Sequence, residues 1–228
     1  MTDLCARIRR PGRTAPPRAL TPVARPRVAP VTEADRVCAL PIRGTTNLAQ
    51  PGEITRLLRT PAGRITLRPI QEQALAELRA GGGLLGAIGV GHGKSLIALL
   101  AGAALNARLA LVLCPPSSVD QLRRTLAEAR ANFRIPDTRI VSFSLLSVAA
   151  GTALLEELAA DVPFSDVVLV ADEVHSVKRA QAARTKRVLR FLQAHPEVRF
   201  VALSGTLTSK SLRDFGHIAE LALRSGSP

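Results

Sequence analysis

The chain has 228 residues, of which 46% are hydrophobic and 21% are charged, so it can bury a core and is not disordered throughout. Its 31 basic and 18 acidic residues give a net charge of +13, which attracts polyanions and makes nucleic acid the first partner to consider. Six Phe residues without Tyr or Trp argue against a protein that grips single strands by stacking bases on aromatic rings. Contacts with nucleic acid are therefore expected on the phosphates.

The three cysteines, Cys5, Cys38 and Cys114, are odd in number and lack the spacing of zinc ligands, which argues against a disulfide framework. The sequence shows neither the apolar segment of a secretion signal nor a run of 18 apolar residues. These features predict a cytoplasmic protein with no membrane partner.

Residues 1–45 are rich in proline and arginine, a composition that breaks helices and offers little to bury. Residues 1–60 contain 11 arginines and 4 acidic residues, a net +7 of the total +13. We expect 1–45 to form a flexible basic arm, either a tether to nucleic acid or a solvated tail. The folded domain is expected over 46–228.

From residue 67 onward, helical spacing of apolar residues alternates with short apolar runs typical of strands. Helices are predicted over 71–79, 94–105, 117–132, 153–159 and 180–194, with a last one from about Ser209. Strands are predicted over 84–90, 109–114, 139–143, 166–171 and 199–203. Because parallel strands need crossover connections, this alternation predicts an α/β fold with helices on both faces of a parallel sheet. Ligands of such sheets bind at the carboxyl ends of the strands.

The first predicted strand leads into a glycine-rich segment directly before a helix. This segment reads Gly89-Val90-Gly91-His92-Gly93-Lys94-Ser95. Its glycines let backbone N–H groups surround an anion, Lys94 can reach the outer phosphates, and the Ser95 hydroxyl can hold Mg²⁺. The strict signature has glycine where this chain has Ile88, and a simple tight turn is the structural alternative. The strand before the segment and the Lys-Ser pair after it favour a phosphate-binding loop.

An acidic pair, Asp172 and Glu173, follows the fourth predicted strand, and His175 lies two residues further on. Adjacent carboxylates at the end of a buried strand need a partner, and Mg²⁺ is such a partner. Asp172 would hold the ion, and Glu173 would orient and deprotonate the water that attacks the γ-phosphate of ATP.

Three more motifs come in a fixed order around these two. Leu67-Arg68-Pro69-Ile70-Gln71 precedes the loop, Leu113-Cys114-Pro115-Pro116 ends the second strand, and Leu203-Ser204-Gly205-Thr206 ends the fifth. Over residues 60–220 the set resembles the first RecA-like lobe, a P-loop NTPase fold, of superfamily 2 DExH-box helicases and translocases. The SNF2-like proteins are the subgroup that it resembles most.

The resemblance implies a role for each matching residue. Gln71 would read adenine, while the loop residues and the acidic pair would bind and hydrolyse Mg-ATP. Coupling between the nucleotide and nucleic acid would involve His175, Ser204, Gly205 and Thr206. Pro115, Pro116 and Ser117 would contact the phosphate backbone of a nucleic-acid strand.

Motors of this superfamily have two RecA-like lobes, and the second supplies arginines that reach the γ-phosphate. We expect this chain to be a single lobe that hydrolyses ATP weakly alone and works with a second lobe in another chain or a missing C-terminal part. DNA is favoured over RNA as the partner. Two alternatives stay open: a basic adaptor that binds nucleotide or nucleic acid and regulates a complete motor, and another P-loop enzyme such as a packaging ATPase or a small kinase.

Overall fold

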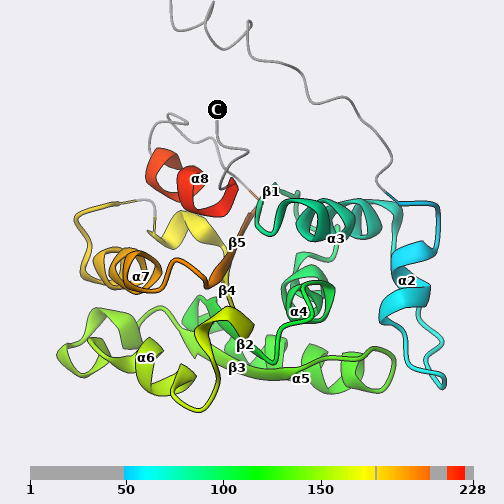
Figure 1. Cartoon of the computed structure of the whole chain (residues 1–228), viewed down its shortest axis with the longest axis horizontal. Coiled ribbons are helices and arrows are strands. Elements are labelled where there is room, and N and C mark those ends of the chain that lie inside the picture. Colours follow the sequence, from blue (N-terminus) through cyan, green and yellow to red (C-terminus); the bar gives the residue numbers. More distant parts are fainter. Residues whose placement is uncertain (1–48, 178, 206–214, 224–228) are drawn as a thin grey trace, which may run out of the picture. The chain divides into compact units, whose positions relative to one another are not determined.

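The computed structural model describes residues 49–177, 179–205 and 215–223, and its centre is a five-stranded, all-parallel sheet (Figure 1). The strand order is β1-β5-β4-β2-β3. The strands are β1 (Leu84–Ala87), β2 (Leu109–Cys114), β3 (Asp137–Ser142), β4 (Val167–Asp172) and β5 (Arg199–Ser204). The predicted parallel α/β fold is confirmed, and each strand overlaps a predicted one, although β1 ends three residues earlier and β3 begins two residues earlier than expected.

The path of the chain places helices on both faces of the sheet. From β1 through β2 to β3 the chain advances across the sheet by way of α4 (Lys94–Ala104) and α5 (Val119–Arg130), and it returns by way of α6 (Leu154–Ala159) and α7 (Ala183–Ala194). Because crossovers are right-handed, reversing the direction moves the connecting helices to the opposite face. Two further helices, α2 (Glu53–Leu58) and α3 (Pro69–Gly81), join α4 and α5, whereas α8 (Gly216–Leu223) joins α6 and α7 (Figure 1).

Alternate residues of each strand belong to two separate hydrophobic cores. In β2, Ala110 and Val112 pack with α3, α4 and α5, whereas Leu109, Leu111 and Leu113 pack with the core that contains α6, α7 and α8. Every residue of β2 is buried, as expected of a central parallel strand covered on both faces. The two cores hold the strands in register and so fix where their carboxyl ends lie.

The buried carboxylate of Glu72 on α3 holds α2 in place. It accepts hydrogen bonds from the backbone N–H of Gly52 at 2.7 Å and of Thr55 at 3.0 Å, and from the Thr55 hydroxyl at 2.5 Å. Thr55 Oγ1 in turn accepts from the N–H of Leu67 at 3.0 Å. This network ties the segment before α3 to the helix that begins at Pro69.

Three arginines donate hydrogen bonds to backbone carbonyls at helix ends. Arg79 Nη1 donates to the Ala104 carbonyl at 2.9 Å, and Arg199 Nη1 donates to the Leu105 carbonyl at 2.6 Å. Arg139 Nη1 donates to a carbonyl in the last turn of α6 at 2.6 Å. Carbonyls at helix C-termini lack intrahelical donors and carry partial negative charge, so each contact satisfies an acceptor and stabilises a helix end.

Short 3₁₀ segments occupy several connections. They are η1 (Pro116–Ser118), η2 (Leu145–Ser147), η3 (Ala149–Gly151), η4 (Phe164–Asp166) and η5 (Val174–Val177). The expected arm at 1–45, Thr206 and the expected helix start at Ser209 lie outside the described residues. None of the described helices combines the length and apolar character that crossing a bilayer requires.

Candidate functional site

The carboxyl ends of β1, β5 and β4 are neighbours in the sheet, and a cavity of about 390 Å³ lies at this edge. The loop after β1 and the acidic pair at the end of β4, which are about 80 residues apart in sequence, both line it. The lining residues are Gly89, Val90, Gly91, Gly93, Lys94, Ser95, Ser118, Gln121, Leu122, Asp172 and Glu173. Lys94 and the acidic pair therefore share one cavity.

The loop between β1 and α4 depends on two glycines with positive φ. Gly91 has φ 84° and Gly93 has φ 75°, conformations that other residues adopt only with strain. Gly93 caps α4, whose first turn contains no acidic residue and receives no side-chain hydrogen bond from the cap. The N-terminal N–H groups of a helix attract anions, so this turn suits a phosphate group. His92 is exposed and is not part of the cavity lining.

Two residues at the start of α3 brace this loop. Gln71 is only 4% exposed; its Oε1 accepts from the N–H of Arg68 at 2.8 Å and its Nε2 donates to the Gly93 carbonyl at 3.2 Å. Arg68 Nη1 donates to the Gly91 carbonyl at 2.8 Å. The resemblance assigns adenine recognition to Gln71. The hydrogen bond from Arg68 to the Gly91 carbonyl was not predicted, because it depends on how α3 packs beside α4.

Lys94 and Glu173 form an ion pair inside the cavity. Lys94 Nζ donates to Glu173 Oε1 at 2.7 Å, and the two side chains are 10% and 26% exposed. Burial alone would raise the pKa of Glu173, but the hydrogen bond and charge of Lys94 lower this pKa below its ordinary value. Glu173 also has φ 62°, an uncommon conformation for a non-glycine residue that recurs at functional sites.

Asp172 is buried beside this pair, and its Oδ1 has no hydrogen-bond partner among the described residues. Desolvation, followed by the charge of Glu173, raises the pKa of Asp172 to about 6. An unpartnered buried carboxylate oxygen is costly, and a cation would remove the cost. The donors fit Mg²⁺, which is commonly bound by one or two carboxylates together with substrate phosphates and water. In the part of the chain that the structure describes, no group of three or more His, Cys, Asp or Glu side chains is arranged so that it could hold a metal ion by itself.

A short chain of polar contacts leads from Glu173 toward the end of β5. Glu173 Oε2 lies 3.2 Å from His175 Nδ1 and accepts from the Ser204 hydroxyl at 3.4 Å, and His175 Nδ1 is 3.5 Å from the same hydroxyl. A Cβ atom at Gly205 would lie 2.8 Å from Lys94 Nζ, so a larger side chain would press on the ion pair. Thr206, to which the resemblance assigns the same coupling role, lies outside the described residues.

The end of β2 borders the cavity from the other side of β4. Ser118, Gln121 and Leu122 line it, whereas Pro115, Pro116 and Ser117 do not. The sequence did not identify Gln121 and Leu122, because only the strand order brings α5 beside the phosphate loop. Cys114, at the end of β2, is fully buried. Burial, then the charge of Asp172, raises the pKa of its thiol to about 11, so it is not a reactive thiolate.

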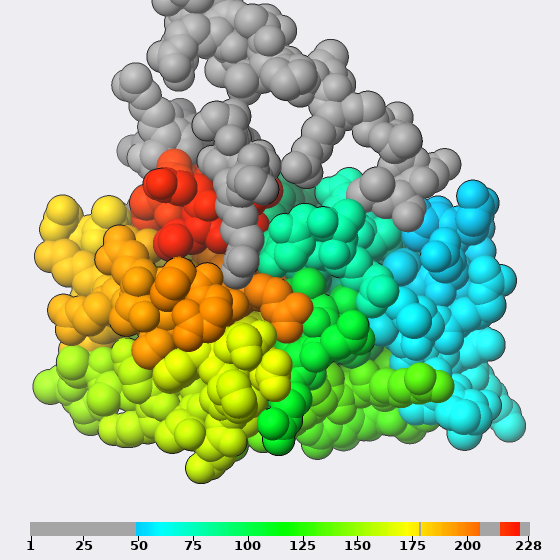
Figure 2. Space-filling model, viewed as in Figure 1, coloured from blue at the N-terminus to red at the C-terminus, as the bar shows by residue number. Residues whose placement is uncertain are grey.

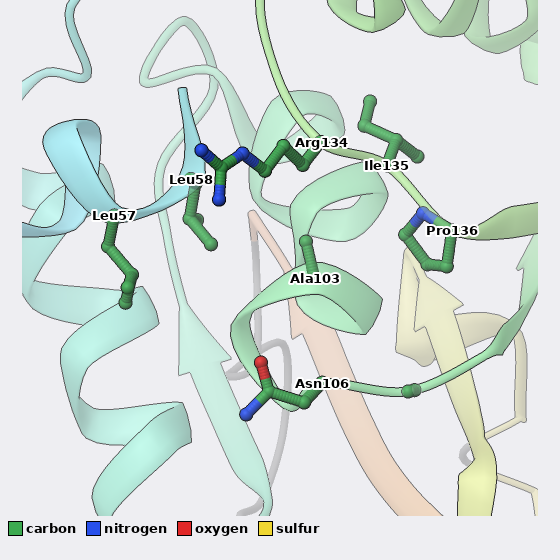
Figure 3. Close-up of a pocket in the computed structure, with 8 residues that line it drawn as sticks. Leu57, Leu58, Ala103, Asn106, Arg134, Ile135 and Pro136 are labelled. Carbon is green, nitrogen blue, oxygen red and sulfur yellow. The ribbon is translucent and has the colours of Figure 1, made fainter. Parts of the chain in front are cut away.

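A second cavity of about 400 Å³ lies at the opposite edge of the sheet, before the first residues of β2 and β3 (Figure 3). Two of its eight lining residues, Arg134 and Asn106, have polar side chains, and Figure 3 shows Arg134 beside Leu58 of α2. Because ligands of parallel sheets bind at the carboxyl ends of strands, the first cavity is the candidate site.

No curated protein matches this chain. Residues 68–215 match the DEAD/DEAH box helicase family, and this range contains the phosphate loop, the acidic pair and Ser204-Gly205. The match covers well over half of the chain and all five strands. The protein therefore belongs to the DEAD/DEAH box helicase family.

Proposed function

We propose that this chain is the ATP-binding first lobe of a DExH-type, SNF2-like helicase or translocase that couples Mg-ATP hydrolysis to the remodelling of nucleic acid. The observation that carries this proposal is the shared cavity, in which the phosphate loop and the acidic pair meet at the contact between Lys94 and Glu173. The SNF2-like resemblance favours DNA over RNA as the substrate.

Ser95 and Asp172 would hold Mg²⁺, since the Asp172 Oδ1 atom lacks a partner within the described structure. When bound, Mg²⁺ neutralises charge on the phosphate oxygens and promotes phosphoryl transfer. Lys94 would exchange Glu173 for a phosphate oxygen. This exchange frees the Glu173 carboxylate from Lys94, whose hydrogen bond and charge lower its pKa, and so leaves it a better acceptor for a proton from water.

The polar contacts around Glu173 would couple the nucleotide to the rest of the lobe. Ser204 and His175 both contact Glu173 Oε2, so a change of partner at Glu173 alters their hydrogen bonds as well. Gln71, whose Nε2 donates to the Gly93 carbonyl, would take part in adenine recognition. Nucleic-acid contacts at Pro115, Pro116 and Ser117 remain part of the proposal.

Efficient turnover would need a second RecA-like lobe, from another chain or another part of the same protein. No arginine is among the described residues that line the cavity. An arginine that reaches the γ-phosphate accelerates hydrolysis by about 10³ to 10⁵. A rate above about one turnover per second for the isolated chain with nucleic acid, measured as phosphate release, would contradict this requirement.

The central test is nucleotide binding by the Lys94→Ala variant. A fluorescent ATP analogue titrated into the full chain with Mg²⁺ should bind the wild type and lose at least about tenfold in affinity with Lys94→Ala, because a charged hydrogen bond to phosphate is removed. Arg56→Ala, at an exposed position on α2, is the matched control and should bind normally. Equal affinities of wild type and Lys94→Ala would refute the assignment of the loop.

A further inference from the structure

Helix α7 and the residue Arg179 before it carry a concentrated positive charge. We define the α7 basic surface as Arg179, Arg184, Lys186, Arg187 and Arg190. Residues 179–194 contain these five basic side chains and no acidic one. Arg179, Lys186 and Arg190 are exposed, and Figure 2 shows the α7 segment, in orange, at the surface of the molecule.

This charge is not balanced within the described structure. The ion pairs among the described residues include Arg108 with Asp166 and Arg123 with Asp120, but none of them involves the α7 basic surface. The first turn of α7, like those of α4 and α8, contains no acidic residue, whereas the first turns of α2, α3, α5 and α6 each contain at least one. Cations near a helix N-terminus are unfavourable, so an external anion would relieve repulsion that the fold retains.

The packing of α7 directs this charge outward. Its buried residues, Thr185, Val188, Phe191 and Leu192, face the core shared with α6 and α8. Arg187 Nη1 donates to the carbonyls of two residues, in η2 and just after it, at 2.5 Å each, which ties α7 to the loop after β3. That loop follows the carboxyl end of its strand, so the first turns of α7 lie toward the edge of the sheet that carries the nucleotide cavity.

We propose that the α7 basic surface binds the phosphate backbone of a nucleic-acid duplex. This inference rests on the proposed function and adds a second contact region, separate from the segment after β2. The aromatic ring of α7, Phe191, is only 1% exposed, so the surface offers no platform for unstacked bases. Lys186 and Arg190 are one helical turn apart, about 5–6 Å between Cβ atoms, and each strand of B-DNA carries one phosphate per 3.4 Å of its axis, so both cations can reach one backbone.

The test compares two double variants of the full chain. Lys186→Gln/Arg190→Gln removes two charges from the α7 basic surface, and Arg56→Gln/Arg130→Gln removes two exposed charges from α2 and α5, which cover the other face of the sheet. Affinity for a labelled 20-base-pair DNA duplex is measured by fluorescence anisotropy across a range of KCl concentrations. The slope of log K against log salt should become shallower by about 1.8 in the first variant and stay unchanged in the second, since each lost phosphate contact changes the slope by about 0.9.

Equal slopes for the wild type and Lys186→Gln/Arg190→Gln would overturn the proposal. Displacement of the duplex by poly-glutamate as effectively as by unlabelled duplex would also overturn it, because the surface would then fit an acidic protein. Binding of the fluorescent ATP analogue is measured on the same samples. Failure of the wild type to bind the nucleotide would count against the proposed function. Normal nucleotide binding together with an unchanged salt slope for Lys186→Gln/Arg190→Gln would count against the α7 basic surface alone.

Discussion

Glu173→Gln should tighten nucleotide binding while it abolishes hydrolysis. In the structure, Lys94 donates to Glu173 Oε1 at 2.7 Å, and the Lys94 side chain is only 10% exposed. A phosphate group that binds Lys94 must replace Glu173 as its partner. The energy of the existing contact therefore opposes nucleotide binding in the wild type.

The size of the effect follows from the type of contact. A hydrogen bond that involves charged groups contributes about 1.5–3 kcal/mol. Glutamine keeps a neutral acceptor at the same place, so we expect the substitution to remove about half of this competition. Half of this range is about 0.8–1.5 kcal/mol, which corresponds to a gain in affinity of about fourfold to twelvefold. Hydrolysis should be lost because an amide cannot accept the proton of the attacking water.

A fluorescent, non-hydrolysable ATP analogue measures the gain directly in the presence of Mg²⁺. Glu157→Gln, on the exposed side of α6, removes the same charge away from the cavity and serves as the control. An affinity of Glu173→Gln equal to or weaker than that of the wild type would show that the ion pair does not compete with phosphate, and would refute the exchange of partners at Lys94.

Three further predictions concern Asp172, the glycines of the phosphate loop, and Glu72. Burial raises the pKa of Asp172 from 3.8 to about 6, so the native state binds its proton more tightly than the unfolded chain and loses stability as pH rises through this window. Asp172→Asn should therefore stabilise the metal-free protein at pH 8 by up to about 3 kcal/mol, and this gain should disappear near pH 4. Thermal unfolding at the two pH values measures both effects. Equal melting temperatures of wild type and variant at pH 8 would contradict the prediction. Gly93→Ala should reduce analogue affinity more than Gly91→Ala, because both have positive φ but only a Cβ at Gly93 would meet Gln71 Nε2. Glu72→Gln should lower the free energy of unfolding in urea by about 1.5–3 kcal/mol, and an unchanged urea midpoint would show that the buried carboxylate does not stabilise α2.

The sequence predicted those elements whose pattern is local. β2 and β4 are continuous apolar runs, so their positions were readable, with β2 over the residues expected and β4 shifted by one residue. The strand predicted to reach Val90 ends at Ala87, because the chain turns there into the phosphate loop, although the Ile88 N–H still donates to the Ser204 carbonyl at 3.0 Å. Helix α2 was not predicted, since it has only six residues and depends on Glu72, 17 to 20 residues away.

The candidate site divides in the same way. Lys94 and the acidic pair belong to short motifs that sequence alone could read, and the strand order then brings them to one cavity. The contacts of Arg68 and the position of Gln121 depend on neighbouring helices, which no local pattern encodes. The roles assigned to Pro115 and its neighbours remain predictions.

The arginines at the helix ends set a limit on surface engineering of this chain. The many arginines of this basic chain are natural candidates for replacement by lysine or alanine to aid crystallisation. Arg79, Arg139 and Arg199 should be exempt, because each guanidinium closes a helix end through a directed contact that a flexible ammonium group would not reproduce. Positions such as Arg56, where no such contact exists in the described structure, are the appropriate targets.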